Sequence, residues 1–137
     1  SVMRKRYAAA VSLALAGALP GLALLLPAHP ASAAQDQMSF KDDVQPIFKL
    51  YCTSCHAAPN GEGYKASGLD LTTYQGAMKG TKYGPMIVPG NAEYSNLMWL
   101  LDWRASPQLR MPHGKKQLPA GERNIIRAWI NQGAKDN

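Results

Sequence analysis

The stretch Cys52-Thr53-Ser54-Cys55-His56 is the most informative motif of this sequence. Its two cysteines are separated by two residues, and a histidine follows the second cysteine directly. Residues three and four apart lie on the same face of a helix, so a helical turn here would point all three side chains in one direction. Two thiols and an imidazole so arranged can form two thioether bonds to a haem and bind its iron. The pattern is therefore typical of a c-type haem attachment site, with Cys52 and Cys55 as anchors and His56 as an iron ligand.

Three other kinds of site use two cysteines at this spacing. A thioredoxin-type redox pair belongs to a strand–helix–strand unit, and no parallel-strand pattern surrounds Cys52. A structural zinc site usually has four Cys or His ligands, and outside the motif the chain offers only His29 and His113. A disulfide between Cys52 and Cys55 is the usual fate of two cysteines in an oxidising compartment. The adjacent His56 favours haem over all three.

Residues 1–34 have the three parts of a secretory leader. A basic start at 4–6 precedes an apolar run from Ala8 to Leu26, and Ala31-Ser32-Ala33 is a small-residue cleavage site. The alternative is an uncleaved membrane anchor formed by residues 7–26, because this run approaches the roughly 20 apolar residues that span a bilayer. We therefore expect export to the periplasm, with membrane anchoring only if the leader is retained.

Residues 35–137, the expected mature part, have the length of one small domain. The whole chain carries 15 Lys and Arg against 9 Asp and Glu, and leaving out the three basic residues at 4–6 gives 12 against 9. This mild excess lacks the clustered basic footprint of a nucleic-acid-binding protein, but it suits transient docking on an acidic redox partner. A covalent haem would also help such a small domain to form a core.

The pattern within residues 35–137 predicts helices joined by loops rich in Gly and Pro, without an alternating run for a β-strand. Apolar residues at helical spacing predict about four helices, which cover 40–51, 74–79, 92–103 and a last stretch from near Pro119 to Gly133. Pro46 either kinks the first helix or lies in the first turn of a shorter one. Residues 57–67 are predicted to be a loop. Met98 and Trp129 lie on apolar helical stripes and are expected in the core.

A haem iron that is bound by one histidine has a second axial position. A methionine there raises the reduction potential and suits electron transfer. The candidates beyond the motif share a sulfur or imidazole donor, and they are Met78, Met86, Met98, Met111 and His113. Met111 stands apart because it lies in irregular chain before Pro112, which favours an extended backbone at Met111. Met111 is the predicted second ligand, His113 is the alternative ligand, and gap-filling packing is the alternative role of Met111.

Five short segments, in this order, give the chain a wider resemblance. They are C-x-x-C-H at 52–56, a shifted G-x-L-x-L at 68–71, G-P-x-I-V-P-G at 84–90, M-P at 111–112 and W-I-x-x-G-A at 129–134. With them the chain resembles the monohaem class I-like cytochrome c domains. The resemblance implies an all-α fold whose first and last helices cross near one haem. It also implies that Cys52 and Cys55 hold haem c covalently, with His56 and Met111 as the axial ligands.

The expected function is one-electron transfer between respiratory or dehydrogenase partners, and not catalysis. One alternative is a haem-bearing subunit of a larger membrane or dehydrogenase complex. The other is a haem sensor or peroxidase-like protein with an open sixth position, for which His113 is the one candidate distal group. An iron–sulfur bond to Met111 would distinguish the carrier from the open-site protein.

Overall fold

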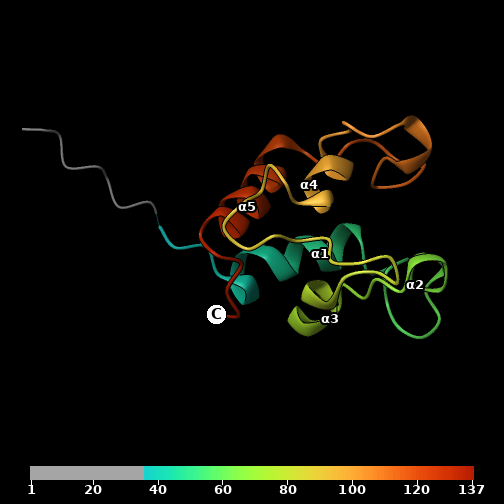
Figure 1. The fold of residues 1–137 in the computed structure, drawn as a ribbon, viewed down its shortest axis with the longest axis horizontal. Coiled ribbons are helices and arrows are strands. Elements are labelled where there is room, and N and C mark those ends of the chain that lie inside the picture. The colour runs from blue at the N-terminus through green and yellow to red at the C-terminus, as the bar shows by residue number, and fades with distance from the viewer. Residues whose placement is uncertain (1–35) are drawn as a thin grey trace, which may run out of the picture. The chain divides into compact units, whose positions relative to one another are not determined.

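The computed structural model describes residues 36–137 of the chain (Figure 1). The expected leader at 1–34 lies outside these residues. The described part is helical and contains no β-strand, so the all-α prediction is confirmed for it. Its elements are η1 (Phe40–Val44), α1 (Gln45–Tyr51), α2 (Glu62–Ser67), α3 (Tyr74–Lys79), α4 (Asn96–Leu101), η2 (Pro107–Leu109) and α5 (Ala120–Asn131). Within this part, none of the helices has both the length and the apolar character to cross a membrane.

The first predicted helix, 40–51, is divided by Pro46. Residues Phe40–Val44 form a π-helical turn, in which the N–H of Gln45 donates to the carbonyl of Phe40. Pro46 then lies in the first turn of α1. A proline fits there because its missing N–H would have had no partner within the helix. The shorter helix, one of the two alternatives that the sequence allows, is the one that forms.

The later helices differ in how closely they follow the sequence signals. Helix α3 has the predicted bounds, because the Thr73 hydroxyl accepts a hydrogen bond from Gly76 N at 3.0 Å and Gly80, at φ +79°, ends it. Helix α5 begins directly after Pro119, as predicted. Helix α4 is shorter than the predicted 92–103, because residues 92–95 form a turn before it.

Helix α2 was not predicted, and the expectation of loop throughout 57–67 is wrong at Glu62–Ser67. The glycines that suggested a loop have another physical reason. A Cβ on Gly61 would overlap the carbonyl oxygen of Cys55, so the backbone approaches the preceding turn too closely for any side chain. Close packing between segments therefore requires this glycine.

The core forms where η1, α4 and α5 meet (Figure 1). The ring of Phe40 lies 5.3 Å from Tyr74 and 5.5 Å from Trp129, measured between centroids. Trp129 is 1% exposed, and its Nε1 donates to the carbonyl of Lys135 at 2.9 Å. Met98 is fully buried. The predictions that Trp129 and Met98 belong to the core are therefore confirmed.

A buried hydroxyl connects the loop before α4 to the start of that helix. Ser95 is fully buried, and its Oγ accepts from Val88 N at 2.9 Å and donates to the carbonyl of Asn91 at 2.8 Å. The amide of Leu97 donates to the carbonyl of Met86 at 2.9 Å. These bonds fix the position of residues 86–91 relative to α4.

A single carboxylate joins the end of α4 to α5. Asp102 accepts from Arg123 Nη1 at 3.0 Å and from Arg127 Nη2 at 2.7 Å, and its side chain is only 12% exposed. Charge-assisted hydrogen bonds of this kind are stronger than neutral ones. Asp102 therefore anchors the point at which the chain leaves α4 for the irregular stretch 103–118.

Candidate functional site

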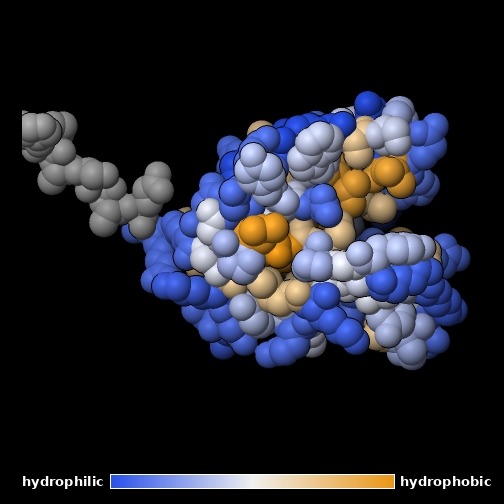
Figure 2. Space-filling model, in the orientation of Figure 1, coloured by the Kyte–Doolittle hydropathy of each residue, from blue (hydrophilic) through white to orange (hydrophobic). Residues whose placement is uncertain are grey.

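A cavity of about 360 Å³ lies between two parts of the chain. One wall is formed by residues from Tyr51, the last residue of α1, to Leu71, and the other by α4 and residues 111–115. Most of the lining is apolar and includes Leu69, Met86 and Leu101. Figure 2 shows apolar residues on the molecular face between the α4–α5 part and the α1–α3 part. Such a cavity suits a large, flat and mostly apolar ligand.

The Cys52–His56 segment forms a turn of its own at the end of α1. The amide of Cys52 donates to Phe48 O at 2.8 Å and completes the last turn of the helix. The carbonyl of Cys52 then accepts from Cys55 N at 3.1 Å and from His56 N at 2.9 Å. This turn brings Cys52, Cys55 and His56 to the lining of the same cavity. The expected helical turn is thus present, although it lies beyond the C-terminal end of α1.

Both thiols of the motif are free, without a disulfide between them. Burial, with a smaller effect of Cys55, raises the pKa of the Cys52 thiol to about 12, and nearby Lys115 only partly opposes this. Cys52 is therefore protonated at neutral pH. The reactive cysteine of a thioredoxin-type pair has a lowered pKa and exists largely as a thiolate. Cys52 is therefore not the attacking thiolate of such a pair.

The imidazole of His56 is held as a neutral group. Burial lowers its pKa, and the nearby backbone of Leu69 partly opposes that shift. His56 Nδ1 is buried and makes no hydrogen bond of good geometry. A neutral imidazole is the form that binds metal ions. His56 therefore has the protonation state that an iron ligand needs.

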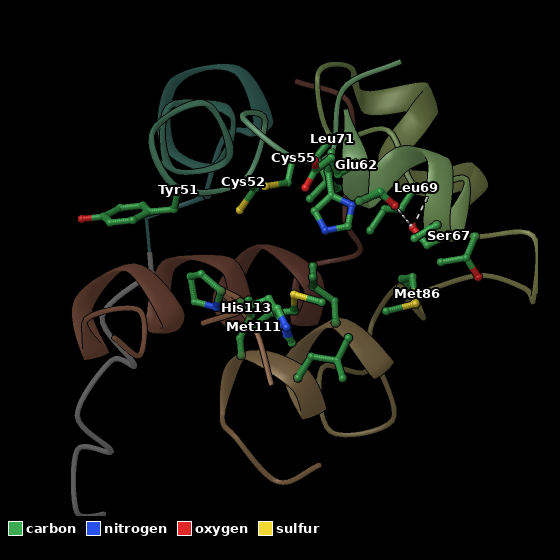
Figure 3. Close-up of a pocket in the computed structure, with 18 of the residues that line it drawn as sticks. Tyr51, Cys52, Cys55, Glu62, Ser67, Leu69, Leu71, Met86, Met111 and His113 are labelled. Atoms are coloured by element: carbon green, nitrogen blue, oxygen red, sulfur yellow. Dashed lines mark hydrogen bonds between the residues drawn. The ribbon is translucent and has the colours of Figure 1, made fainter. Parts of the chain in front are cut away.

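The opposite wall carries the candidates for the second axial position. Figure 3 shows Met111 and His113 across the cavity from Cys52 and Cys55. Met86 also lines the cavity, whereas Met78 and Met98 do not. His113 is exposed, and Met111 is partly buried against the core. The structure thus reduces the five candidates from the sequence to Met86, Met111 and His113.

The backbone of Met111 is bonded through its N–H to α4 and through its carbonyl to Trp103, two residues beyond the end of that helix. Its N–H donates to Leu100 O at 3.2 Å, and its carbonyl accepts from Trp103 Nε1 at 3.0 Å. The Met111–Pro112 peptide bond is cis. Although Met111 lies in irregular chain, its position is therefore fixed relative to a core helix.

These donors fit a covalently attached haem. Two free thiols and a neutral imidazole line one wall of an apolar cavity, and thioether and imidazole side chains line the other. Two thiols can form two thioethers, and His with Met is a known axial pair of c-type haems. In residues 36–137, no group of three or more His, Cys, Asp or Glu side chains is arranged to hold a metal ion. That part of the chain gives no support to the zinc alternative.

Sequence reasoning missed two residues that shape this site. Gly63 packs against the imidazole of His56, and Trp103 donates to Met111. No local signal marks either one, because each acts on a residue seven or eight positions away through irregular chain. An isolated glycine in a loop and a tryptophan after an apolar helix have many ordinary roles.

In the comparison with protein families, residues 52–113 match the family described as Planctomycete cytochrome C (PSCyt1). The match begins at the first cysteine and ends at His113, so it includes residues from both walls of the cavity. No curated protein and no solved structure matches the chain. The family match supports a cytochrome c-type domain in this chain, and such a domain implies a covalently bound haem c and electron transfer.

Proposed function

We propose that this protein is a one-electron carrier with one haem c, which is bound through Cys52 and Cys55 and ligated by His56 and Met111. The observation that supports it best is that these four side chains, from segments more than 50 residues apart, line one apolar cavity. When bound, the haem would supply an iron that alternates between the ferric and ferrous states. The chain has only two cysteines, which supports a single haem.

The protein's own residues would set the properties of such a carrier. The apolar lining excludes water, and a thioether ligand favours the ferrous state, so both raise the reduction potential. Helix α5 packs on η1, the segment that leads into α1 and the cysteine turn. This packing is consistent with a class I-like arrangement in which the first and last helices cross.

Met111 is preferred to the other two candidates because of how it is held. Its backbone N–H is bonded to Leu100 in α4 and its carbonyl to Trp103 just after that helix, whereas the His113 side chain is exposed. The test compares Met111→Ala with His113→Ala and Met86→Leu in the ferric holoprotein. Only Met111→Ala should abolish the weak far-red absorption of a sulfur–iron bond. Loss of this band in Met86→Leu, or its absence from the unsubstituted protein, would refute the assignment.

Carrier function is tested by a reductive titration of the holoprotein. We expect a single reversible one-electron transition, and little binding of carbon monoxide to the ferrous form because the sixth position is filled. Fast carbon monoxide binding, or turnover of peroxide, would favour the open-site sensor or peroxidase-like alternative.

We propose that the carrier docks on acidic redox partners through the rim of the cavity. Lys115 lines the cavity and is exposed. The neighbouring Lys116 is also exposed. Replacing both with Gln should slow association with an acidic partner several-fold at low salt and have little effect at high salt. Replacement of Lys41 and Lys135, which are exposed outside the cavity lining, is the matched control. Equal rates for the two double variants would refute this docking surface.

The proposed location is the periplasm, and it rests on the leader that the sequence predicts at 1–34. Purification from the native source tests the location and the subunit alternative together. A free protein that begins near residue 35 supports the soluble carrier, whereas stable copurification with a dehydrogenase or membrane complex supports the subunit.

A further inference from the structure

We propose that Trp103 is a positioning residue for Met111, which holds the thioether on the iron through a hydrogen bond to the Met111 carbonyl. This inference rests on the proposed function, because it assumes that Met111 is the sixth ligand. It concerns the part of the site that belongs to no helix, where the position of a ligand depends most on individual contacts.

The bond joins a loop ligand to a rigid support. Trp103 Nε1 lies 3.0 Å from the carbonyl oxygen of Met111, and the two residues are eight positions apart. The second tether of Met111, from its N–H to Leu100 O at 3.2 Å, also leads to the end of α4. That end is well anchored, because Leu101 is 2% exposed and the neighbouring Asp102 is bound by two arginines of α5.

The backbone at Trp103 adopts an unusual conformation. Its φ is +58°, in the left-handed region that residues with a side chain rarely enter. This turn closes α4, with Trp103 N bonded to Leu100 O at 3.3 Å and Arg104 N bonded to Trp99 O at 3.0 Å. A strained residue persists only where its surroundings determine its conformation, and such residues concentrate at functional sites.

A second contact holds the indole ring. The guanidinium carbon of Arg110 lies 5.3 Å from the centre of the Trp103 ring, within the range of a cation–π interaction. Arg110 directly precedes Met111 in the chain. The indole therefore contacts the segment of the candidate ligand twice, once through its ring face and once through its N–H.

The alternative is that Trp103 is an ordinary packing residue of the loop 103–118. A packing role would make a substitution lower the overall stability without a particular effect on the sixth ligand. A positioning role predicts that the ligand bond weakens more than the fold does. The two roles are therefore separated by measuring how easily an added ligand displaces Met111 in the variants.

The experiment uses the holoprotein with Trp103→Phe, which keeps an aromatic ring and removes the N–H. Trp99→Phe is the matched control, because Trp99 also has an arginine on its ring, Arg104 at 4.8 Å, but is 45% exposed. Imidazole is titrated into the ferric protein, and displacement of the sulfur ligand is followed by loss of the far-red absorption. We expect imidazole to bind about five-fold tighter to Trp103→Phe, which corresponds to the loss of one hydrogen bond, and with unchanged affinity to Trp99→Phe.

Hydrogen exchange of the indole N–H groups in the unsubstituted holoprotein gives an independent readout, which remains available if Trp103→Phe fails to fold. The Trp103 proton should exchange more slowly than that of Trp99. Equal exchange rates, or equal imidazole affinities of the two variants, would overturn the inference. If the unsubstituted ferric protein itself lacks the far-red band, the assignment of Met111 as ligand fails, and the role of Trp103 falls with it.

Discussion

Gly63 packs directly against the imidazole ring of His56. A Cβ placed on Gly63 would lie 2.8 Å from Cε1 of this ring and 3.0 Å from each of its nitrogens. Real Cβ atoms essentially never come that close to another heavy atom, so any side chain here would displace the ring. The backbone of α2 thus limits the orientations open to the proposed iron ligand.

The first prediction concerns Gly63→Ala. Alanine should favour a helix such as α2 by up to about 1 kcal/mol, so a local effect alone would stabilise the protein. The contact with His56 should outweigh this gain, and we expect a net loss of about 1–3 kcal/mol with a reduced yield of holoprotein. Denaturant unfolding of the holoprotein and its haem content provide the measurement.

Gly121→Ala is the control for this substitution. Gly121 lies in the first turn of α5, and a Cβ there would meet nothing within 4 Å. Its replacement should be neutral or slightly stabilising. If Gly63→Ala and Gly121→Ala have the same stability and absorption spectrum, the contact of Gly63 with His56 affects neither the stability of the holoprotein nor its haem site.

The second prediction concerns the buried hydroxyl of Ser95. Ser95→Ala removes the acceptor of Val88 N and the donor to Asn91 O, and it should cost about 1–3 kcal/mol because these buried groups lose their partners. Ser106 is exposed and makes no capping bond, so Ser106→Ala should stay within about 0.5 kcal/mol of the unsubstituted protein. Thermal unfolding of both variants checks this. Similar midpoints would show that the Ser95 network does not hold residues 86–91.

The third prediction is a pH dependence at Asp70. Partial burial opposes ionisation of its carboxyl, but hydrogen bonds from the Thr72 hydroxyl, the Thr72 amide and the backbone of Ala58 together lower its pKa from the ordinary 3.8. A carboxyl with a lowered pKa in the folded state stabilises the fold above the pKa of the unfolded state, and this contribution is lost as pH falls through the folded-state pKa.

Asp70→Asn should therefore cost about 0.5–1 kcal/mol at pH 7, a modest value because this loop is solvated. The difference from the unsubstituted protein should persist down to about pH 5 and then shrink as the pH falls further. Denaturant unfolding at a series of pH values gives the comparison. A difference that stays constant down to pH 2 would mean that the charge of Asp70 contributes nothing to stability.

The elements that the sequence predicted well are those with signals inside the element. Helix α3 lies between a capping threonine, Thr73, and a stop glycine, Gly80, so its bounds follow from local chemistry. Helix α2 was missed because Gly61 and Gly63 resemble loop residues, although they are required by contacts with Cys55 and His56. A sequence pattern shows which residues are small, but it does not show what approaches them.

The candidate site shows the same difference between signals that are local in the sequence and contacts that are not. The cysteine motif is local, so its three side chains could be assigned from spacing alone. Met111 was chosen because it lies outside the helical stripes, and the structure places it on the cavity wall together with Met86 and His113. The contact of Trp103 with Met111 depends on how α4 ends at a left-handed residue, which no periodicity predicts.

The most direct test of the account is the mass of the secreted protein after production in a host that matures c-type cytochromes. We predict that the peptide containing Cys52, Cys55 and His56 carries the mass of one haem, and that neither cysteine reacts with a thiol reagent after denaturation. A colourless protein of unmodified mass with two reactive thiols would contradict it.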